Sequence, residues 1–105
     1  MSEGNIPYFV NNFFSKKTNS EGDTISFDDL RRYGNCVASI IVPNGSPTPN
    51  GGTYMYWYVI QIAFYTGNDY VVQIATSSGS NYEIYMRKYF DYNKTWSSWQ
   101  KVSVS

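Results

Sequence analysis

The sequence contains no histidine and a single cysteine, Cys36. Without histidine, Ser-His-Asp and Cys-His catalysis and histidine-ligated metals are excluded. One cysteine cannot build an internal disulfide framework or a cysteine-based zinc site. We therefore expect a protein that is not an enzyme and that has no cofactor and no metal site.

Carboxylates are few and scattered along the chain. Glycoside hydrolysis needs two facing carboxylates about 5–10 Å apart, and no such pair stands out in the sequence. The adjacent pair Asp28-Asp29 is better explained by capping of a helix. A glycan depolymerase is therefore the weakest of the functional hypotheses. The carboxylates considered are Asp28, Asp29, Asp69, Glu83 and Asp91.

Charge is scarce and balanced, with eight basic and eight acidic residues among 105. A chain without basic excess gains little by displacing counterions from a phosphate backbone, so nucleic-acid binding is not expected. The longest apolar run, residues 54–60, is too short to span a bilayer. The start, residues 1–4, lacks the basic region of a signal peptide. We expect neither membrane insertion nor a signal peptide.

Aromatic residues are abundant at 19%, and eleven of them are tyrosines. Such a composition suits a β-sheet and also a recognition surface. Short apolar runs separated by Gly, Ser and Asn predict a mostly β fold, a small antiparallel sheet or sandwich-like knob. One irregular lead-in over residues 1–25 would precede one β-rich domain over 26–105. The expected strands cover residues 37–42, 53–65, 70–76, 82–90 and 96–104.

Two elements carry further expectations. Residues 26–34 predict one short N-terminal helix, capped by Ser26 and Asp29 and stopped by Gly34. Both faces of the strand at residues 53–65 are apolar, which predicts a central strand covered on both sides. No charged residue lies between Gly34 and Asn68, and such a stretch requires either burial or a partner.

Arg87, Trp96 and Trp99 form the most specific local pattern. A guanidinium can stack on an indole face, with a gain of about 2 kcal/mol or more when water is excluded. One hypothesis is a glycan platform, in which an indole stacks on a sugar and Arg87 binds its hydroxyls. The other is a structural clasp made of Gln73, Arg87 and Trp99, which would lock the last strands together. On a regular strand Trp96 and Trp99 point to opposite faces, so both can contribute to one site only through a bulge.

Gln73 places an amide in an apolar strand. An unpaired buried amide costs about 1–3 kcal/mol, so we expect it to bond backbone groups or Arg87.

A cluster of aromatic residues follows the Pro/Gly-rich loop at residues 44–52. Two interpretations stand beside each other. The cluster can pack within the sheet and at a trimer interface, or it can form a receptor-binding patch, since aromatics near loops make binding hot spots. The residues concerned are Tyr54, Tyr56, Trp57 and Tyr58.

Several short motifs follow one another along the chain from about Phe27 to Ser103. They are Asp28-Asp29-Leu30 with Gly34, the apolar strand at 55–64, Val72-Gln73-Ile74, Ile84-Tyr85-Met86-Arg87, and Trp96-Ser97-Ser98-Trp99-Gln100-Lys101. Together they resemble the pyocin knob family, found in phage tail fibres and related pyocin-type particles. The resemblance implies a virion protein at or near a fibre tip. It also implies a homotrimer that acts outside the cell in host adsorption and receptor binding, with no catalysis.

The functional hypotheses are therefore three. The first is a fibre knob that binds a host-surface receptor or glycan. The second is a monomeric carbohydrate-binding module with an open aromatic platform. The third is the glycan depolymerase.

Overall fold

The computed structural model describes residues 15–18, 26–43, 45–65 and 67–103, with backbone alone for 15–18. The fold is mostly β, as the sequence predicts, and these described residues form one seven-stranded sheet and one 3-10 helix. The elements are β1 (Ser15–Thr18), η1 (Asp29–Tyr33), β2 (Cys36–Ile41), β3 (Tyr56–Phe64), β4 (Tyr70–Ser77), β5 (Tyr85–Phe90), β6 (Thr95–Trp96) and β7 (Gln100–Lys101).

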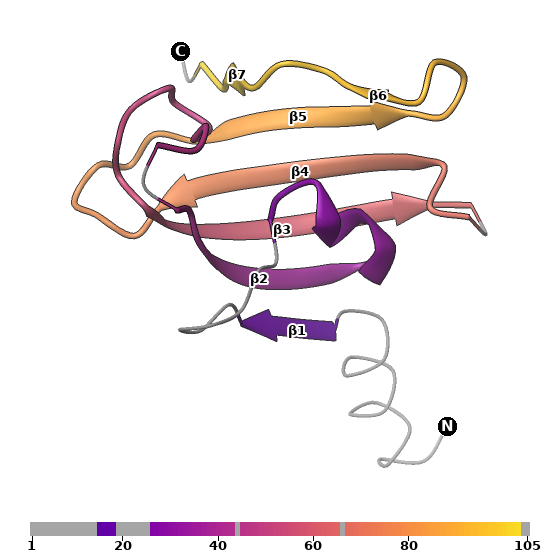
Figure 1. Ribbon diagram of the computed structural model, residues 1–105, viewed down its shortest axis with the longest axis horizontal. Coiled ribbons are helices and arrows are strands. Elements are labelled where there is room, and N and C mark those ends of the chain that lie inside the picture. The colour runs from indigo at the N-terminus through magenta and orange to yellow at the C-terminus, as the bar shows by residue number, and fades with distance from the viewer. Residues whose placement is uncertain (1–14, 19–25, 44, 66, 104–105) are drawn as a thin grey trace.

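The centre of the sheet is an antiparallel meander, β2-β3-β4-β5 (Figure 1). β1 pairs with β2 in parallel at one edge, and β6 and β7 both pair with β5 at the other edge. β1 falls within residues 1–25, where the sequence predicts an irregular lead-in. Residues 1–14 and 19–25 lie outside the described part of the chain, so the proposed boundary at residue 26 stays a prediction.

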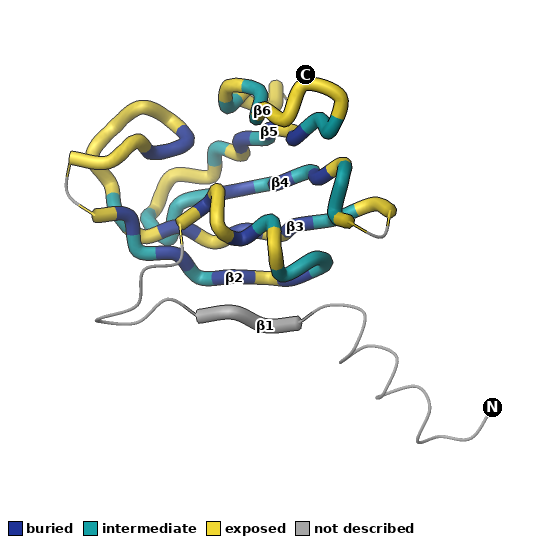
Figure 2. The backbone as a smooth tube through the Cα atoms, turned by 45° about the vertical axis from the view of Figure 1, so that its right-hand side comes forward, coloured by how far each residue is buried: buried dark blue, intermediate teal, exposed yellow. Residues whose placement is uncertain are grey.

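The alternation of side chains along the strands produces two different faces. Buried and exposed residues alternate along β2, β3 and β4 (Figure 2). One face, which we call the covered face, lies against η1, visible in front of the sheet in Figure 1. The core on this face comprises Phe27, Leu30, Cys36, Ala38, Ile40, Val42, Trp57, Val59, Ala75 and Tyr85.

The opposite face, which we call the open face, differs from the expectation for β3. β3 is central, but only one of its two faces is covered by the described residues. Tyr56, Tyr58 and Ile60 point to the other face and are about half exposed. Among the described residues, the sheet is therefore a single layer on this side. A period-2 pattern reveals that both faces are apolar, but it does not say which face another element will cover.

The expected short helix is not confirmed, because a five-residue 3-10 helix stands in its place. The predicted cap is present in part, since Ser26 Oγ accepts a hydrogen bond from the Asp29 N–H at 3.1 Å. The C-terminal end of this 3-10 helix is held by the side chain of Gln61. Its Nε2 donates to the carbonyls of Leu30 (2.8 Å) and Gly34 (2.6 Å). Gly34 has a φ of 68°, which favours glycine.

The expected last strand over residues 96–104 is interrupted. Trp96 pairs with Tyr89 and Gln100 pairs with Met86, so three residues of the later strand face two of β5. This one-residue excess is a β-bulge. It is held by Ser97, whose N–H donates to the Lys88 carbonyl at 2.7 Å and whose Oγ accepts from the Lys88 N–H at 3.0 Å.

β2 and β4 agree with the expected strands to within one residue, whereas β3 and β5 are shorter than expected. The expected starts at residues 53 and 82 become Tyr56 and Tyr85. Within the described part of the chain, no helix is long and apolar enough to span a membrane.

Candidate functional site

Three polar side chains lie in a row across the covered face. The register pairs Gln61 of β3 with Gln73 of β4, and Gln73 with Arg87 of β5. All three are buried, and both glutamines are completely so. Antiparallel pairing thus brings together residues that are far apart in the sequence, directly beneath η1.

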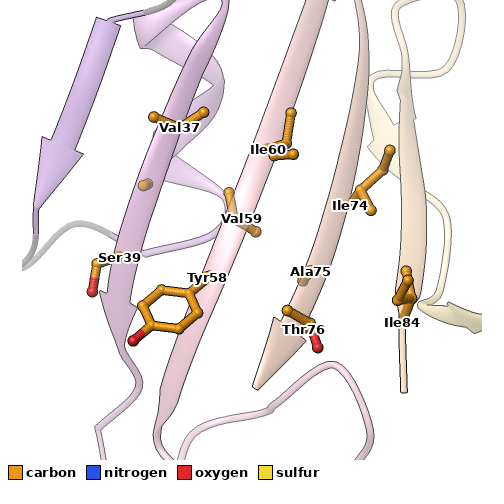
Figure 3. A pocket seen from close by; sticks show the side chains of 10 residues that line it. Val37, Ser39, Tyr58, Val59, Ile60, Ile74, Ala75, Thr76 and Ile84 are labelled. Carbon is orange, nitrogen blue, oxygen red and sulfur yellow. The ribbon is translucent and has the colours of Figure 1, made fainter. Parts of the chain in front are cut away.

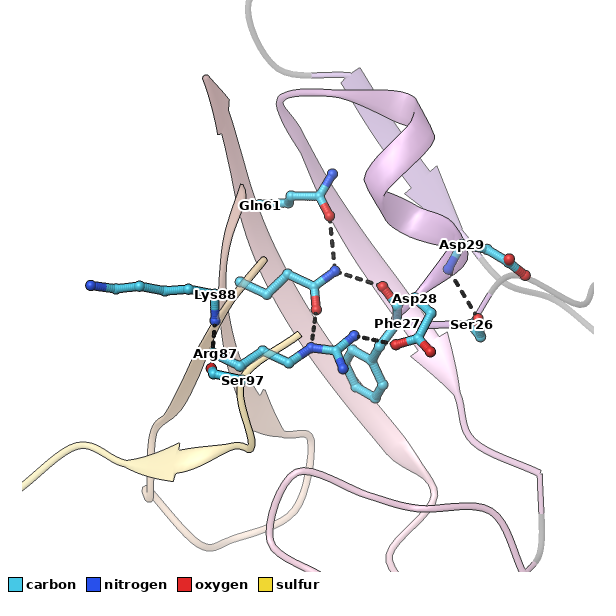
Figure 4. A network of polar contacts seen from close by, with 9 residues as sticks. Ser26, Phe27, Asp28, Asp29, Gln61, Arg87, Lys88 and Ser97 are labelled. Carbon is cyan, nitrogen blue, oxygen red and sulfur yellow. Dashed lines mark hydrogen bonds and ion pairs between the residues drawn. The ribbon is translucent and has the colours of Figure 1, made fainter. Parts of the chain in front are cut away.

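These side chains form a continuous chain of hydrogen bonds, which we call the amide relay (Figure 4). Arg87 Nε donates to Gln73 Oε1 at 2.8 Å. Gln73 Nε2 donates to Gln61 Oε1 at 2.8 Å and to the Phe27 carbonyl at 2.6 Å. Gln61 Nε2 continues to the carbonyls that end η1. Both partners expected for Gln73, a backbone group and Arg87, are therefore present.

The guanidinium of Arg87 is enclosed by aromatic rings. Its central carbon lies 3.8 Å from the ring centroid of Trp96, 4.8 Å from that of Trp99 and 6.0 Å from that of Phe27. Nη2 forms an ion pair with Asp28 Oδ1 at 2.7 Å. Burial lowers the pKa of Arg87 below its ordinary value, and the bond to Asp28 opposes this shift. The group remains charged at any physiological pH.

Both tryptophans reach Arg87 because of the bulge after β6. A regular strand would have placed Trp96 and Trp99 on opposite faces, and the extra residue restores them to the same face. Each ring is also fixed by a neighbour. Trp99 packs edge-to-face on Phe27 at 5.2 Å, and Trp96 on Tyr89 at 5.3 Å. This arrangement has the geometry that the clasp hypothesis requires.

A hollow of about 780 Å³ lies beside the clasp, between it and the loop that follows β2. Figure 1 shows this loop rising past the ends of β3 and β4 toward β5 and β7. Both indoles line the hollow, together with the largely exposed Asp28 side chain and several serines. Flat apolar walls with a few hydrogen-bonding groups suit a sugar ring. The lining residues used below are Asp28, Ser46, Trp96, Ser97, Ser98 and Trp99.

The aromatic cluster at residues 54–58 is divided by the sheet. Trp57 is completely enclosed in the core, and its Nε1 donates to the Tyr54 carbonyl at 2.7 Å, so its ring is not available to a ligand. Tyr54, Tyr56 and Tyr58 are exposed, and the rings of Tyr54 and Tyr56 touch edge-to-face at 6.0 Å. The strand alternation is the physical reason for this division.

A second polar cluster, which sequence reasoning missed, joins β7 to the start of β5. The Tyr85 hydroxyl donates to Glu83 Oε2 at 2.5 Å, and Lys101 Nζ lies 3.0 Å from Glu83 Oε1. These bonds lower the pKa of Glu83, the Tyr85 hydroxyl contributing most and Lys101 next. They also raise the pKa of Tyr85. The signal in the sequence was the two-residue spacing of Glu83 and Tyr85, which puts both on one side of an extended segment.

Three of the five carboxylates named above form ion pairs within the described residues. Asp28 pairs with Arg87, Asp91 with Lys94 at 3.1 Å, and Glu83 with Lys101. In the part of the chain that the structure describes, no three His, Cys, Asp or Glu side chains are grouped closely enough to hold a metal ion.

No protein-family model, curated protein or solved structure matches this chain. The resemblance to the pyocin knob family therefore stays a prediction from the motifs.

Proposed function

We propose that this protein is a non-enzymatic knob module of a phage tail fibre or a phage-like particle. In this role it forms a homotrimer, acts outside the cell, and binds a glycan on the host surface. The hollow beside Arg87 is the glycan site. Trp96 and Trp99 stack on the sugar, while the clasp holds the rings in place.

The observation that carries this proposal is the fixed orientation of two indoles on the wall of one hollow. Its volume of about 780 Å³ lies within the usual range for small-molecule sites, roughly 300–1,000 Å³. Asp28, Ser97 and Ser98 supply acceptors and hydroxyls for sugar hydroxyl groups. Because Arg87 already fixes both rings, ligand binding loses little side-chain entropy. The clasp and the platform are then two functions of the same residues.

The alternative is a monomeric carbohydrate-binding module. It is favoured by Tyr54, Tyr56 and Tyr58, which are exposed together on one molecule. In that case the tyrosines would bind the sugar in place of the hollow.

The test is binding of the labelled protein to a panel of immobilised bacterial surface glycans. Ser46→Trp fills the hollow from an exposed position without removing any member of the clasp. Ser80→Trp is the matched control, since Ser80 is exposed on the loop between β4 and β5 and does not line the hollow. We expect Ser46→Trp to weaken binding at least tenfold, about 1.4 kcal/mol, and Ser80→Trp to leave it unchanged.

Other outcomes decide between the hypotheses. Binding that survives Ser46→Trp but is lost in Tyr56→Ala would favour the monomeric module. Absence of binding to every glycan in the panel would contradict both sugar-binding proposals.

A further inference from the structure

The open face is a broad apolar surface formed by the described residues. Seven large apolar side chains on it are more than one third exposed, and the aliphatic and aromatic residues between them are partly buried. Several exposed residues of the charge-free segment between Gly34 and Asn68 therefore lie on a surface that no described residue covers. The seven are Val37, Tyr56, Tyr58, Ile60, Phe64, Tyr70 and Ile84.

The area of this surface lies at the upper end of what an isolated domain normally exposes. With about 150–250 Å² for an aromatic side chain and somewhat less for an aliphatic one, the exposed parts of the seven side chains present roughly 450–700 Å². The largest apolar patch on a monomer is typically about 300–600 Å². A stable interface between two proteins buries about 800 Å² on each partner. The open face therefore approaches the size of one side of such an interface.

The chemistry of the face favours a protein of the same kind. Lys88, near one end, is the single charged residue that β2 to β5 place there. A glycan would need several hydrogen-bonding groups, but the central residues Val37, Ile60, Ile74 and Ile84 offer none. A second apolar sheet offers a matching surface, because two such faces pack about 10 Å apart with interdigitated side chains.

The shape of the face also permits interdigitation. A hollow of about 450 Å³ lies between β2, β3, β4 and the segment before β5 (Figure 3). Its walls include Val37, Ile60, Ile74 and Ile84, and the Tyr58 ring stands at one side. A hollow of this size accepts one large apolar side chain from a partner. The protruding tyrosine beside it provides such a side chain, so the face carries both the projection and the hollow that a head-to-tail contact closed around a three-fold axis requires.

We infer that the open face is the surface through which copies of this chain pack against one another. The inference deepens the proposed function and rests on it for the number of copies, which is three. In this arrangement Tyr58 of each copy fills the hollow of a neighbour. The glycan site lies on the covered side and remains accessible in the assembly.

The first experiment is light scattering of the full chain over a dilution series. Tyr58→Glu places a charge at the centre of the contact, and we expect it to raise the concentration of half-dissociation at least about 100-fold. Tyr82→Glu makes the same change in the loop between β4 and β5, at a side chain that is 92% exposed, and should leave the assembly intact. Circular dichroism establishes that both variants are folded.

The second experiment remains informative if Tyr58→Glu fails to fold. Val37→Cys puts a thiol on the open face, and Ser80→Cys puts one on the loop between β4 and β5, at a residue that does not line the open-face hollow. The native Cys36 is completely buried and therefore inert to an alkylating reagent. We expect the thiol at position 37 to react at least tenfold more slowly at concentrations where the protein is assembled, and the thiol at position 80 to react equally at all concentrations.

The possible results separate the inference from the proposed function. A stable trimer with a reactive thiol at position 37 would overturn the inference and leave the trimer standing. A dimer with a protected thiol would support the interface and contradict the trimer. A monomer at every concentration would overturn both, while the glycan panel would still test the sugar site.

Discussion

The amide relay leads to a stability prediction that can be worked out bond by bond. Gln73→Met keeps the length of the side chain and removes its polar groups. It leaves three partners without their bond: Arg87 Nε, the Phe27 carbonyl and Gln61 Oε1. A buried polar group without a partner costs about 1–3 kcal/mol. Arg87 and Phe27 border the hollow, where water can replace part of the loss.

We therefore expect Gln73→Met to lower the free energy of unfolding by about 3–5 kcal/mol, summed over the three groups. At about 4–8 °C per kcal/mol for a domain of this size, the melting temperature should fall by at least roughly 12 °C. The assay is urea denaturation followed by circular dichroism, with the m-value checked for constancy. Gln100→Met, at an exposed position, is the control and should change stability by less than about 0.5 kcal/mol.

A double-mutant cycle tests whether the relay acts as one unit. Gln61→Met alone removes the donor to Leu30 and Gly34 as well as the acceptor for Gln73. The double variant breaks the shared bond only once, so its loss should be smaller than the sum by about 0.5–3 kcal/mol. A loss below about 1 kcal/mol in Gln73→Met, or strict additivity in the cycle, would refute the reasoning.

Two further predictions concern the edge of the sheet. Trp99→Ala should destabilise the domain by about 2–3 kcal/mol, less than the roughly 3–5 kcal/mol of a fully buried aromatic because the ring is only partly enclosed. Thermal denaturation measures this, and an unchanged melting temperature would indicate that Trp99 serves the ligand alone. The pKa of Glu83 is lower in the folded state than its ordinary value of 4.5. Its contribution to stability is therefore complete above about pH 4.5 and is lost as the pH falls through the lower folded value. Glu83→Gln should remove this part of the acid sensitivity in melts between pH 7 and pH 3, and identical pH profiles for the two proteins would contradict it.

The two faces of the sheet give the proposed functions separate locations. The hollow and the clasp lie on the covered side, with the loop after β2 and the bulge of β6 and β7. The open face lies on the other side of the same strands. A variant such as Ser46→Trp therefore tests glycan binding without altering assembly, and Tyr58→Glu tests assembly without altering the glycan site.

The roles of individual residues show how far sequence reasoning reached. The sequence identifies Gln73 as a hydrogen-bonded core residue, because a lone amide in an apolar strand must find a partner. Gln61 sits in an equally apolar strand, but its part in the relay depends on the register that pairs it with Gln73. The sequence groups Trp57 with its tyrosine neighbours as a possible ligand residue. In the structure, the alternation of side chains along β3 places Trp57 in the core instead. Its burial depends on contacts between distant segments, among them the edge-to-face packing of its ring on Tyr85 of β5.

Sequence reasoning alone establishes the mostly β character, the four strands of the central meander and the two-faced pattern along each of them. These follow from local chemistry, because turn residues and side-chain periodicity act over a few neighbouring positions. The tertiary structure alone decided which face η1 covers and the register that joins Gln61, Gln73 and Arg87. It also decided the position of the bulge that turns Trp96 and Trp99 toward one guanidinium. Each of these depends on contacts between segments distant in the chain, and a shift of a single residue would reverse the face on which a side chain lies.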